Sequence, residues 1–517
     1  MPTPVHVGRG MLATDAYQLT MAQLYFREGL HARTVRFEHF YRSNPDYGEH
    51  QAGYGVAAGL GPFVEWVRST RATPADVEAL RGHLGRRGER LFDDAFCDWF
   101  ADLDFSDLRI AAVPEGRVVH PNTPITVVEG PLAVAQVMET PLLNQLNFST
   151  LIATKASRVA DAALGRPVLE FGMRRGPDAG ADAGSRAALV GGASGTSNAA
   201  EGYRLGVAPA GTHAHSMVQL FMALGGDESS AFEAYADAYP DDCLLLVDTV
   251  DTLGSGVPNA IRVFERLRRT GHEPVGIRLD SGDLAYLAVR SARLLDAAGF
   301  DAVSIVLSSQ LDELRIWQIV QQIAAEAPRA GVDADRVIGR LVFGVGSRLA
   351  ASDGDPSLDG VYKLVAVQDE SEWKPAIKFS DSPAKLLNPG AKRLWRLSAP
   401  DGSATADVLA VADEELVPGA DLVLHHHSRP DVSRRLAAAD WVRAEELLVP
   451  VLDRGRTALP ADAGPLGDVD AARARRDADV ALLDPGVRRL VNPHVYHVSI
   501  TDRLAALKRD LVARYAH

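Results

Sequence analysis

From Pro167 onward, the chain alternates short, continuous apolar runs with longer stretches that have the spacing of amphipathic helices. Apolar runs of this length are typical of parallel strands that are buried on both faces of a sheet. Most of the runs end abruptly in Gly, Ser, Asp or His. The runs and the polar segments that follow them are PVLEFG with MRRGPD, APAG with THAHS, CLLLV with DTVDT, VGIRL with DSGD, VSIVL with SSQLDE, and RLVFGV with GSRL.

Residues 283–299 show the helical pattern between two of these runs. Gly299 marks the end of the predicted helix, and its apolar stripe consists of Leu284, Leu287, Val289, Ala292, Leu294 and Leu295. Regular alternation of strand and helix predicts a parallel α/β architecture. Because there are six such units, we expect a closed or partly closed α/β barrel, with an open doubly wound sheet as the alternative. In such folds the chemistry lies where the carboxyl ends of the strands meet their loops.

The two ends of the chain have a different pattern. Residues 1–145 combine helical stretches with short Val/Ile runs punctuated by Pro and Gly, which predicts an N-terminal α+β domain. Residues 371–517 again mix short strands with a terminal helix that Thr501 caps. We expect a barrel domain over residues 146–370 and a C-terminal extension over 371–517 that packs back on the N-terminal domain.

Composition narrows the range of functions. The formal charge of -14 argues against binding a nucleic-acid backbone, which requires a face dominated by Lys and Arg. The two cysteines, Cys97 and Cys243, both lie in apolar or aromatic surroundings and suggest neither a disulfide framework nor a thiolate metal site. Neither a signal peptide nor an apolar run of about 20 residues occurs. We therefore expect a cytoplasmic protein that does not span a membrane.

The segment IRLDSGDLAYL carries the densest group of candidate residues, with Arg278, Asp280 and Asp283 at a predicted strand end. Gly282 permits a tight turn there. Two carboxylates beside a turn suit ribose hydroxyls or a hydrated Mg²⁺. The alternative interpretation is a turn that only caps the following helix.

The segment EFGMRRGPD places Phe171 at a strand end with Arg174 directly beyond it. A stacking ring beside a guanidinium group suits a pyridine mononucleotide. Alternatively, Phe171 belongs to the core and Arg174 to the surface.

The segment GTHAHS holds His213 and His215 two residues apart, so that both share one face of an extended chain. A metal pair would need further ligands, and a nucleophilic histidine is the more specific hypothesis. Asp248 and Asp251 in VDTVDT are candidates to orient its imidazole. A purely structural role is the alternative for either histidine. The run His425–His427 has no accompanying ligands and predicts no metal site.

Small residues follow two further predicted strands, with Ser308 in VLSSQ and with Gly346 and Ser347 in GVGSRL. Their backbone N–H groups and hydroxyls can cradle a phosphate. Either segment can also be a simple tight connection between a strand and a helix.

Taken together, the chain resembles the nicotinate phosphoribosyltransferase family, in which the matching motifs occur in the same order over most of the sequence. The motifs are ATDAYQLTMAQLYF, EFGMRRGPD, GTSNAAEGYRLGV, GTHAHSMV, LLLVDTVDT, IRLDSGDLAYL, FGVGSRL and GVYKLVAV. The resemblance implies an irregular α/β barrel and a homodimer with active sites at the subunit interface. It also implies the substrates nicotinate and phosphoribosyl pyrophosphate, ATP as co-substrate, and Mg²⁺ without direct protein ligands.

The resemblance also assigns roles to individual residues. His215, just before the Ser of GTHAHS, takes a phosphoryl group from ATP, and Asp248 hydrogen-bonds it. Phe171 and Tyr17, the latter from the other subunit, sandwich the pyridine ring. Asp280 holds the ribose hydroxyls. The phosphates are held by Arg174, Arg278 and the backbone at Gly346 and Ser347.

The segment GTSN bears on the choice between acid and amide substrates. Amide-using relatives carry an Asp where this chain has Ser197, and an Asp would repel a carboxylate. Ser197, with Thr196 beside it, is compatible with nicotinate. The chain departs from the family at Val250, at Ser309 and in GSRL, which bears on the phosphate loops. The alternatives are a nicotinamide or quinolinate phosphoribosyltransferase and a non-catalytic, nucleotide-sensing homologue.

Overall fold

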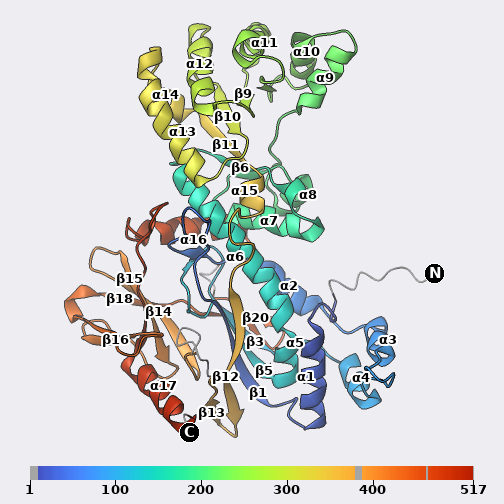
Figure 1. Cartoon of the computed structure of the whole chain (residues 1–517), viewed down its shortest axis with the longest axis vertical. Helices are drawn as coiled ribbons and strands as arrows, with labels where there is room; N and C mark the ends of the chain where they lie inside the picture. Colours follow the sequence, from blue (N-terminus) through green and yellow to red (C-terminus); the bar gives the residue numbers. More distant parts are fainter. Residues whose placement is uncertain (1–9, 379–386, 461–463, 516–517) are drawn as a thin grey trace. The chain divides into compact units, whose positions relative to one another are not determined.

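The structure is a computed structural model that describes residues 10–378, 387–460 and 464–515. The chain divides into two compact units (Figure 1). Unit 2 is the continuous segment Ile152–Pro356, and unit 1 combines Met1–Leu151 with Ser357–His517. The N-terminal and C-terminal segments thus belong to the same unit. None of the described helices is both long and apolar enough to cross a membrane.

Unit 2 is built on a six-stranded sheet in which each neighbouring pair of strands is parallel. In spatial order its strands are β7 (Gly195–Thr196), β6 (Val168–Glu170), β11 (Leu341–Val345), β10 (Ser304–Ser308), β9 (Gly276–Leu279) and β8 (Leu244–Leu246). The predicted parallel α/β architecture is confirmed, and five of the six predicted runs contain strands.

The sheet is open, so the prediction of a closed barrel is wrong. Its edge strands are β7 and β8, and in the described part of the chain these two strands do not pair with each other. A sheet closes into a barrel only when its two edge strands hydrogen-bond to each other along several residues. The edge strand β7 has only two residues. The predicted strand in APAG is also wrong, because residues 207–214 form an irregular connection. The sixth strand is instead β7, which follows α7.

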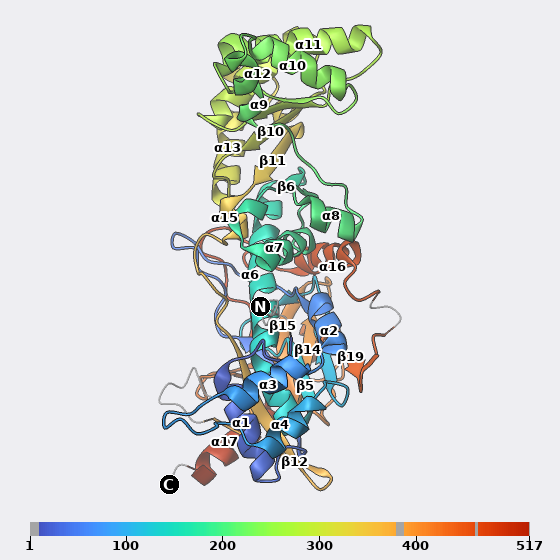
Figure 2. The same cartoon turned by 90° about the vertical axis from the view of Figure 1, so that its right-hand side faces the viewer.

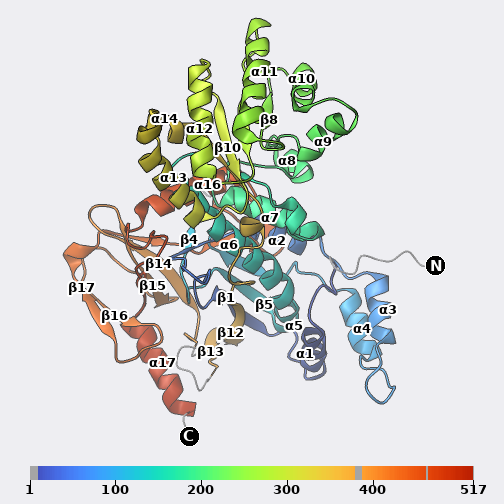
Figure 3. The ribbon, with the colours of Figure 1, turned by 45° about the horizontal axis from the view of Figure 1, so that its top comes forward.

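The helices of unit 2 from α9 to α14 pack against one another in chain order, and α7, α8 and α12 contact the sheet (Figures 1 and 3). Figure 2 shows α9, α10 and α11 together at one end of the unit. The predicted helix over 283–299 is confirmed as α12. The helices of this unit are the C-terminal part of α6 (Glu139–Ala162), α7 (Asp178–Val190), α8 (Ala199–Leu205), α9 (His215–Ala223), α10 (Glu228–Ala238), α11 (Val257–Arg269), α12 (Leu284–Ala297), α13 (Glu313–Glu326), α14 (Ala334–Gly339) and α15 (Ser347–Ala350).

Unit 1 contains two larger sheets built mainly from antiparallel pairs. The first runs β13 (Glu372–Pro375), β12 (Gly360–Asp369), β1 (Thr34–Tyr41), β5 (Thr126–Pro131), β3 (Arg109–Ala112), β19 (Val449–Asp453) and β20 (Arg456–Thr457). The second runs β17 (Ser433–Leu436), β16 (Leu422–His426), β21 (Val498–Thr501), β15 (Ala404–Val411), β14 (Lys392–Ser398) and β18 (Arg443–Glu446). A two-stranded sheet joins β2 (Gly55–Val56) to β4 (Val118–Val119).

The helices of unit 1 include the predicted first and last ones. The helix expected near Tyr17 is α1, and the terminal helix α17 begins after Thr501, whose hydroxyl accepts from the N–H of Leu504. The helices are α1 (Ala16–Arg27), α2 (Leu60–Ser69), α3 (Pro74–Gly82), α4 (Asp94–Ala101), α5 (Leu132–Val137), the N-terminal part of α6, α16 (Val469–Leu482) and α17 (Asp502–Tyr515).

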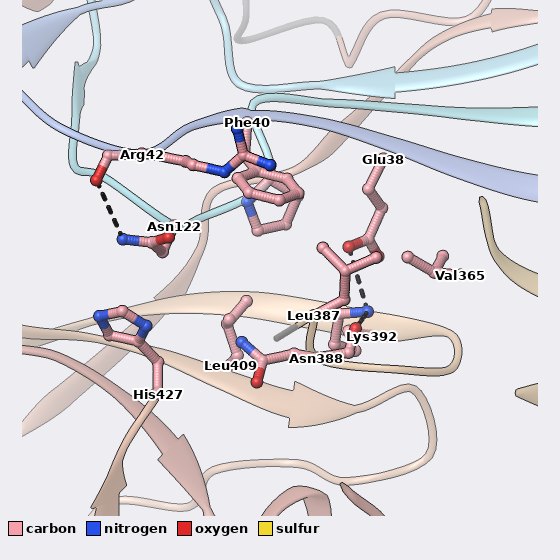
Figure 4. Close-up of a pocket in the computed structure, with 11 residues that line it drawn as sticks. Glu38, Phe40, Arg42, Asn122, Val365, Leu387, Asn388, Lys392, Leu409 and His427 are labelled. Carbon is pink, nitrogen blue, oxygen red and sulfur yellow. Dashed lines mark hydrogen bonds and ion pairs between the residues drawn. The ribbon is translucent and has the colours of Figure 1, made fainter. Parts of the chain in front are cut away.

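A small polar cavity lies inside unit 1 beside a buried lysine (Figure 4). Lys392 pairs with Glu38 at 3.0 Å and donates to the carbonyls of Asn388 and Gly390. Lys508 reaches the same region, where it donates to the Asn388 side chain at 3.0 Å and to the His427 carbonyl at 2.8 Å. Burial, helped by the positive charge of Lys392, lowers the pKa of Lys508 from 10.5 to about 8.

Lys508 gives a pH-dependent test of this packing. Between pH 8 and 10.5 the unfolded chain keeps the Lys508 proton while the folded chain releases it, so stability due to this residue rises with pH. We expect wild type to gain free energy of unfolding relative to Lys508→Met between about pH 7 and about pH 10. Urea unfolding of both proteins across this range measures the difference. If the free energy of unfolding of wild type relative to Lys508→Met stayed constant or fell with rising pH, the lowered pKa of Lys508 would be contradicted.

Candidate active site

The polar residues predicted at the strand ends of unit 2 lie along one edge of its sheet. Because the strands are parallel, their carboxyl ends share that edge. Phe171 follows β6, Asp248 follows β8 by two residues, Asp280 follows β9, and Gly346 follows β11.

Arg278, Asp280 and Ser308 form one hydrogen-bonded cluster across β9 and β10. The Ser308 hydroxyl donates to Asp280 Oδ1 at 2.6 Å and accepts from Arg278 Nε at 2.9 Å. Arg278 Nη2 also reaches Asp280 Oδ1 at 3.2 Å. Thr212, in the connection before α9, accepts from Arg278 Nη1 at 3.1 Å. The cluster fixes a cation and a carboxylate side by side, which suits a ligand carrying both phosphate and hydroxyl groups.

His215 begins α9 and lies beside two carboxylates. Its Nε2 is 3.8 Å from Asp248 Oδ1 and 4.0 Å from Asp280 Oδ2. Both distances are longer than a hydrogen bond. The ring is instead hydrogen-bonded to Thr249, whose Oγ1 is 2.9 Å from Nδ1. The sequence pattern offered Asp248 and Asp251 for this contact, the family resemblance selected Asp248, and both missed Thr249.

Asp248 is held from one side only. Its Oδ2 accepts from the N–H of Asp280 at 2.9 Å and from the hydroxyl of Ser281 at 2.5 Å. Its Oδ1 is buried without a hydrogen bond and is the atom nearest to His215 Nε2. A buried carboxylate oxygen without a donor is costly, and a cation or a bound donor beside it would satisfy it.

His213 differs from His215 although it is only two residues away. Its Nε2 accepts from the backbone N–H of Leu246 in β8 at 3.0 Å, and its ring packs against Tyr235. Burial lowers the pKa of His213 to about 4. Its lone pair is therefore occupied, and its role is structural.

Phe171 packs directly on a glycine of β11. A Cβ atom at Gly344 would lie 2.4 Å from the Phe171 ring, closer than any side chain tolerates. Arg278 approaches the ring, with Cζ 5.3 Å from its centroid. Phe171 is thus a buried ring at the carboxyl end of β6, adjacent to Arg278 of the polar cluster.

Glu170, which the sequence interpretation missed, holds the loop that follows β6. Its carboxylate accepts from Thr196 Oγ1 at 2.6 Å, from Ser185 Oγ at 2.9 Å and from the N–H of Gly172. Thr196 is therefore buried and occupied, whereas Ser197 is exposed and donates its backbone N–H to the Glu170 carbonyl. The two residues that we grouped at GTSN have separate environments.

The remaining predicted residues lie outside this cluster. Arg174 is exposed in the short helix Met173–Arg175. Asp283 caps α12 by accepting from the N–H of Tyr286 at 3.1 Å. Tyr17 lies on α1 in unit 1 with 53% of its surface exposed. Burial, helped by the charge of Glu139, raises its pKa.

Gly346 and Ser347 start α15 at the carboxyl end of β11, as the sequence predicts for a strand-to-helix turn. Asp251 caps the helical turn Thr252–Gly256 by accepting from the N–H groups of Leu253 and Gly254. His425 pairs with Asp502 at 2.9 Å. Within the described ranges, no three His, Cys, Asp or Glu side chains are grouped to hold a metal ion.

Comparison with known proteins identifies one family along the whole chain. The nicotinate phosphoribosyltransferase N-terminal domain matches residues 12–147, the family model matches residues 167–394, and the C-terminal domain matches residues 391–508. The nicotinate phosphoribosyltransferase of Bacillus subtilis (strain 168) is 38% identical over 82% of this chain and 80% of its own length. The Homo sapiens enzyme of that name is 33% identical over 97% and 96%.

A solved structure shows the same similarity in three dimensions. The crystal structure of human nicotinic acid phosphoribosyltransferase is 31% identical in sequence to this chain. The alignment has a TM-score of 0.77 and covers 96% of this chain and 99% of the human one.

The two histidines give a test of their separate environments. We expect His213→Ala to lower the free energy of unfolding by about 2 kcal/mol, because it leaves a buried N–H without an acceptor and opens a cavity. His215→Ala removes a half-exposed ring and should cost less than about 1 kcal/mol. Urea unfolding of the two variants measures both values. Equal losses would show that the two rings contribute alike to stability.

Proposed function

This chain belongs to the nicotinate phosphoribosyltransferase family, and we propose that it joins nicotinate to phosphoribosyl pyrophosphate in an ATP-coupled salvage route to NAD, the Preiss-Handler route. Nicotinate, phosphoribosyl pyrophosphate, ATP and water are converted to nicotinate mononucleotide, pyrophosphate, ADP and phosphate. The observation that carries the proposal is the Arg278–Asp280–Ser308 cluster beside His215 at one sheet edge.

The cluster supplies the groups that the phosphoribosyl donor needs. Asp280 accepts hydrogen bonds from the ribose hydroxyls, and Arg278 neutralises a phosphate next to it. Ser308 keeps both side chains in place through its hydroxyl. Arg174 and the backbone N–H groups of Gly346 and Ser347 hold further phosphate oxygens. Asp283 supports this end of the site through the cap of α12.

The pyridine ring stacks on Phe171, and Tyr17 of the partner subunit covers its other face. This arrangement requires a homodimer with active sites at the interface, which we propose for a cytoplasmic enzyme. Ser197 and Thr196 are uncharged, so neither repels the nicotinate carboxylate. The exposed hydroxyl of Ser197 is the one able to reach a ligand, because Thr196 is occupied by Glu170.

Positioning and electrostatics supply most of the catalysis in this proposal. The bond between ribose C1 and pyrophosphate breaks as the ring nitrogen of nicotinate attacks C1 from the opposite face. The sugar becomes cationic during the step, and the nearby carboxylate of Asp280 stabilises this charge. Holding both substrates in line removes the entropic cost of their encounter.

Mg²⁺, when bound with the pyrophosphate, would neutralise the charge of the leaving group. Asp248 Oδ1 and Asp280 Oδ2 both lie within about 4 Å of His215 Nε2. These two carboxylate oxygens are suited to hold the water ligands of the magnesium ion. The buried Oδ1, without a donor of its own, fits such a hydrated cation.

His215 accepts the γ-phosphoryl group of ATP. The imidazole nitrogen attacks phosphorus, the bond to ADP breaks, and water later releases phosphate. In this proposal Nδ1 donates its proton to Thr249 Oγ1, which leaves the lone pair of Nε2 available. The phosphorylated ring would carry roughly two negative charges by analogy with other phospho-residues, enough to attract Arg278. ATP hydrolysis thereby draws the transfer toward mononucleotide.

Product formation tests the proposal directly. The purified chain is supplied with phosphoribosyl pyrophosphate, Mg²⁺ and either nicotinate or nicotinamide, with and without ATP, while mononucleotide and ADP are followed together. We expect nicotinate-selective turnover, with ADP released and the yield raised by ATP. Preference for nicotinamide would overturn the role of Ser197, and no turnover with either would favour a nucleotide-sensing protein.

His215→Ala separates the two halves of the reaction. We expect loss of ATP hydrolysis and of ATP stimulation, with slow transfer retained, because the sugar site is intact. The matched control is His272→Ala, which removes a surface histidine of the same unit. Unchanged ATP hydrolysis in the His215 variant would refute the phosphohistidine.

Asp280→Asn tests the ribose contact. We expect its KM for phosphoribosyl pyrophosphate to rise at least about tenfold, as the loss of a charged hydrogen bond costs about 1.5–3 kcal/mol. The KM for nicotinate should change far less. Steady-state kinetics with Asp241→Asn, an exposed carboxylate of the same unit, as the control measures both constants. Equal increases for the two substrates would exclude the assigned role.

A further inference from the structure

Arg348 joins the loop that carries the proposed phosphate ligands Gly346 and Ser347 to the loop that follows Ser308. It lies on α15, directly after Gly346 and Ser347 at the end of β11. Its Nη1 contacts Asp312 Oδ2 at 2.5 Å, and Asp312 ends the loop that follows Ser308 and β10. The same nitrogen lies 2.8 Å from Asp353 Oδ2. One guanidinium therefore links the loop after β10 to the loop after β11.

The Asp312 end of this link is anchored in the core of unit 2. Its side chain is 6% exposed, and its Oδ1 caps α13 by accepting from the N–H of Arg315 at 2.8 Å. The next residue, Glu313, is fully buried and pairs with Lys155 at 2.8 Å and Arg158 at 3.0 Å, both on α6. Asp312 is thus a fixed point, and Arg348 fastens the start of α15 to it.

The segment between Ser308 and Asp312 is strained. Ser309 and Gln310 have φ values of 96° and 52°, in the left-handed region that residues with a side chain seldom adopt. Such a conformation persists only where the surrounding contacts determine it. The Arg348–Asp312 pair closes this loop at its far end. Without the pair, the strained segment can relax and carry Ser308 away from Arg278 and Asp280.

We propose that Arg348 is a positioning residue for the phosphoribosyl donor, an inference that rests on the proposed function of the same site. Arg348 acts through the two loops and does not itself bind phosphate, because two carboxylates already neutralise its charge. Separating it from Asp312 would leave a buried carboxylate without its guanidinium, which is unfavourable. The residue therefore acts mainly on affinity for the sugar phosphate, because Ser308 belongs to the cluster with Arg278 and Asp280.

Four variants test the proposal by steady-state kinetics and by calorimetric binding of phosphoribosyl pyrophosphate with Mg²⁺. Arg348→Gln and Asp312→Asn should each weaken donor binding and raise its KM roughly tenfold, with nicotinate KM and kcat within about twofold. The double variant should be no weaker than either single variant, because both remove the same link. Arg348→Lys should recover part of the loss. Asp353→Asn, which removes the exposed carboxylate only, should resemble wild type.

Asp312→Asn distinguishes positioning from direct binding. If Arg348 were a phosphate ligand held back by Asp312, freeing it would tighten donor binding, and this outcome would overturn the proposal. A parallel loss for donor and nicotinate, together with lowered stability, would also overturn it by indicating a general structural role. Normal wild-type turnover with unchanged donor binding in Arg348→Gln would refute this inference alone, whereas a wild type that binds no donor would refute the proposed function and this inference with it.

Discussion

The parallel register of β9, β10 and β11 is the constraint on which the candidate site depends. Arg278 lies opposite Val306, Leu279 opposite Leu307, and Ser308 opposite Gly344. Asp280, one residue past β9, therefore meets Ser308 at the end of β10. A shift of one residue in either strand would turn these side chains to the other face of the sheet and separate the cation from the carboxylate. The hydrogen bonds among Arg278, Asp280 and Ser308 therefore depend on the backbone pairing of β9 with β10.

Much of this edge could be predicted from the sequence, because buried strands that end in polar residues are a local pattern. Asp280 and Ser308 were found in this way, and they do lie together. The closed barrel was wrong because closure depends on whether distant edge strands pair, and a two-residue strand such as β7 leaves no recognisable pattern. The Thr249 contact was missed for a related reason: only the path of the chain after β8 decides which side chain faces His215.

His213 and His215 show how little sequence spacing says about chemical role. Two positions apart, one ring has its lone pair occupied by a backbone N–H of β8, and the other has one nitrogen directed at two carboxylates. The resemblance to a family singled out His215 because of its place before Ser216. The geometry provides an independent reason for preferring it, since a histidine that is already a hydrogen-bond acceptor has no free nucleophilic nitrogen.

Gly344 has a consequence for how this site can vary. The Phe171 ring occupies the space in which a side chain at this position would lie. Even a methyl group there would lie 2.4 Å from a carbon of the ring. A search for altered ring specificity that sampled only residues facing the ligand would overlook this position. Any larger residue at position 344 would displace the Phe171 ring. The position of this ring therefore depends on the absence of a Cβ atom at residue 344. For the proposed pyridine site, libraries aimed at bulkier acids should therefore hold position 344 constant and vary Ser197, the exposed residue that we propose reaches the ligand.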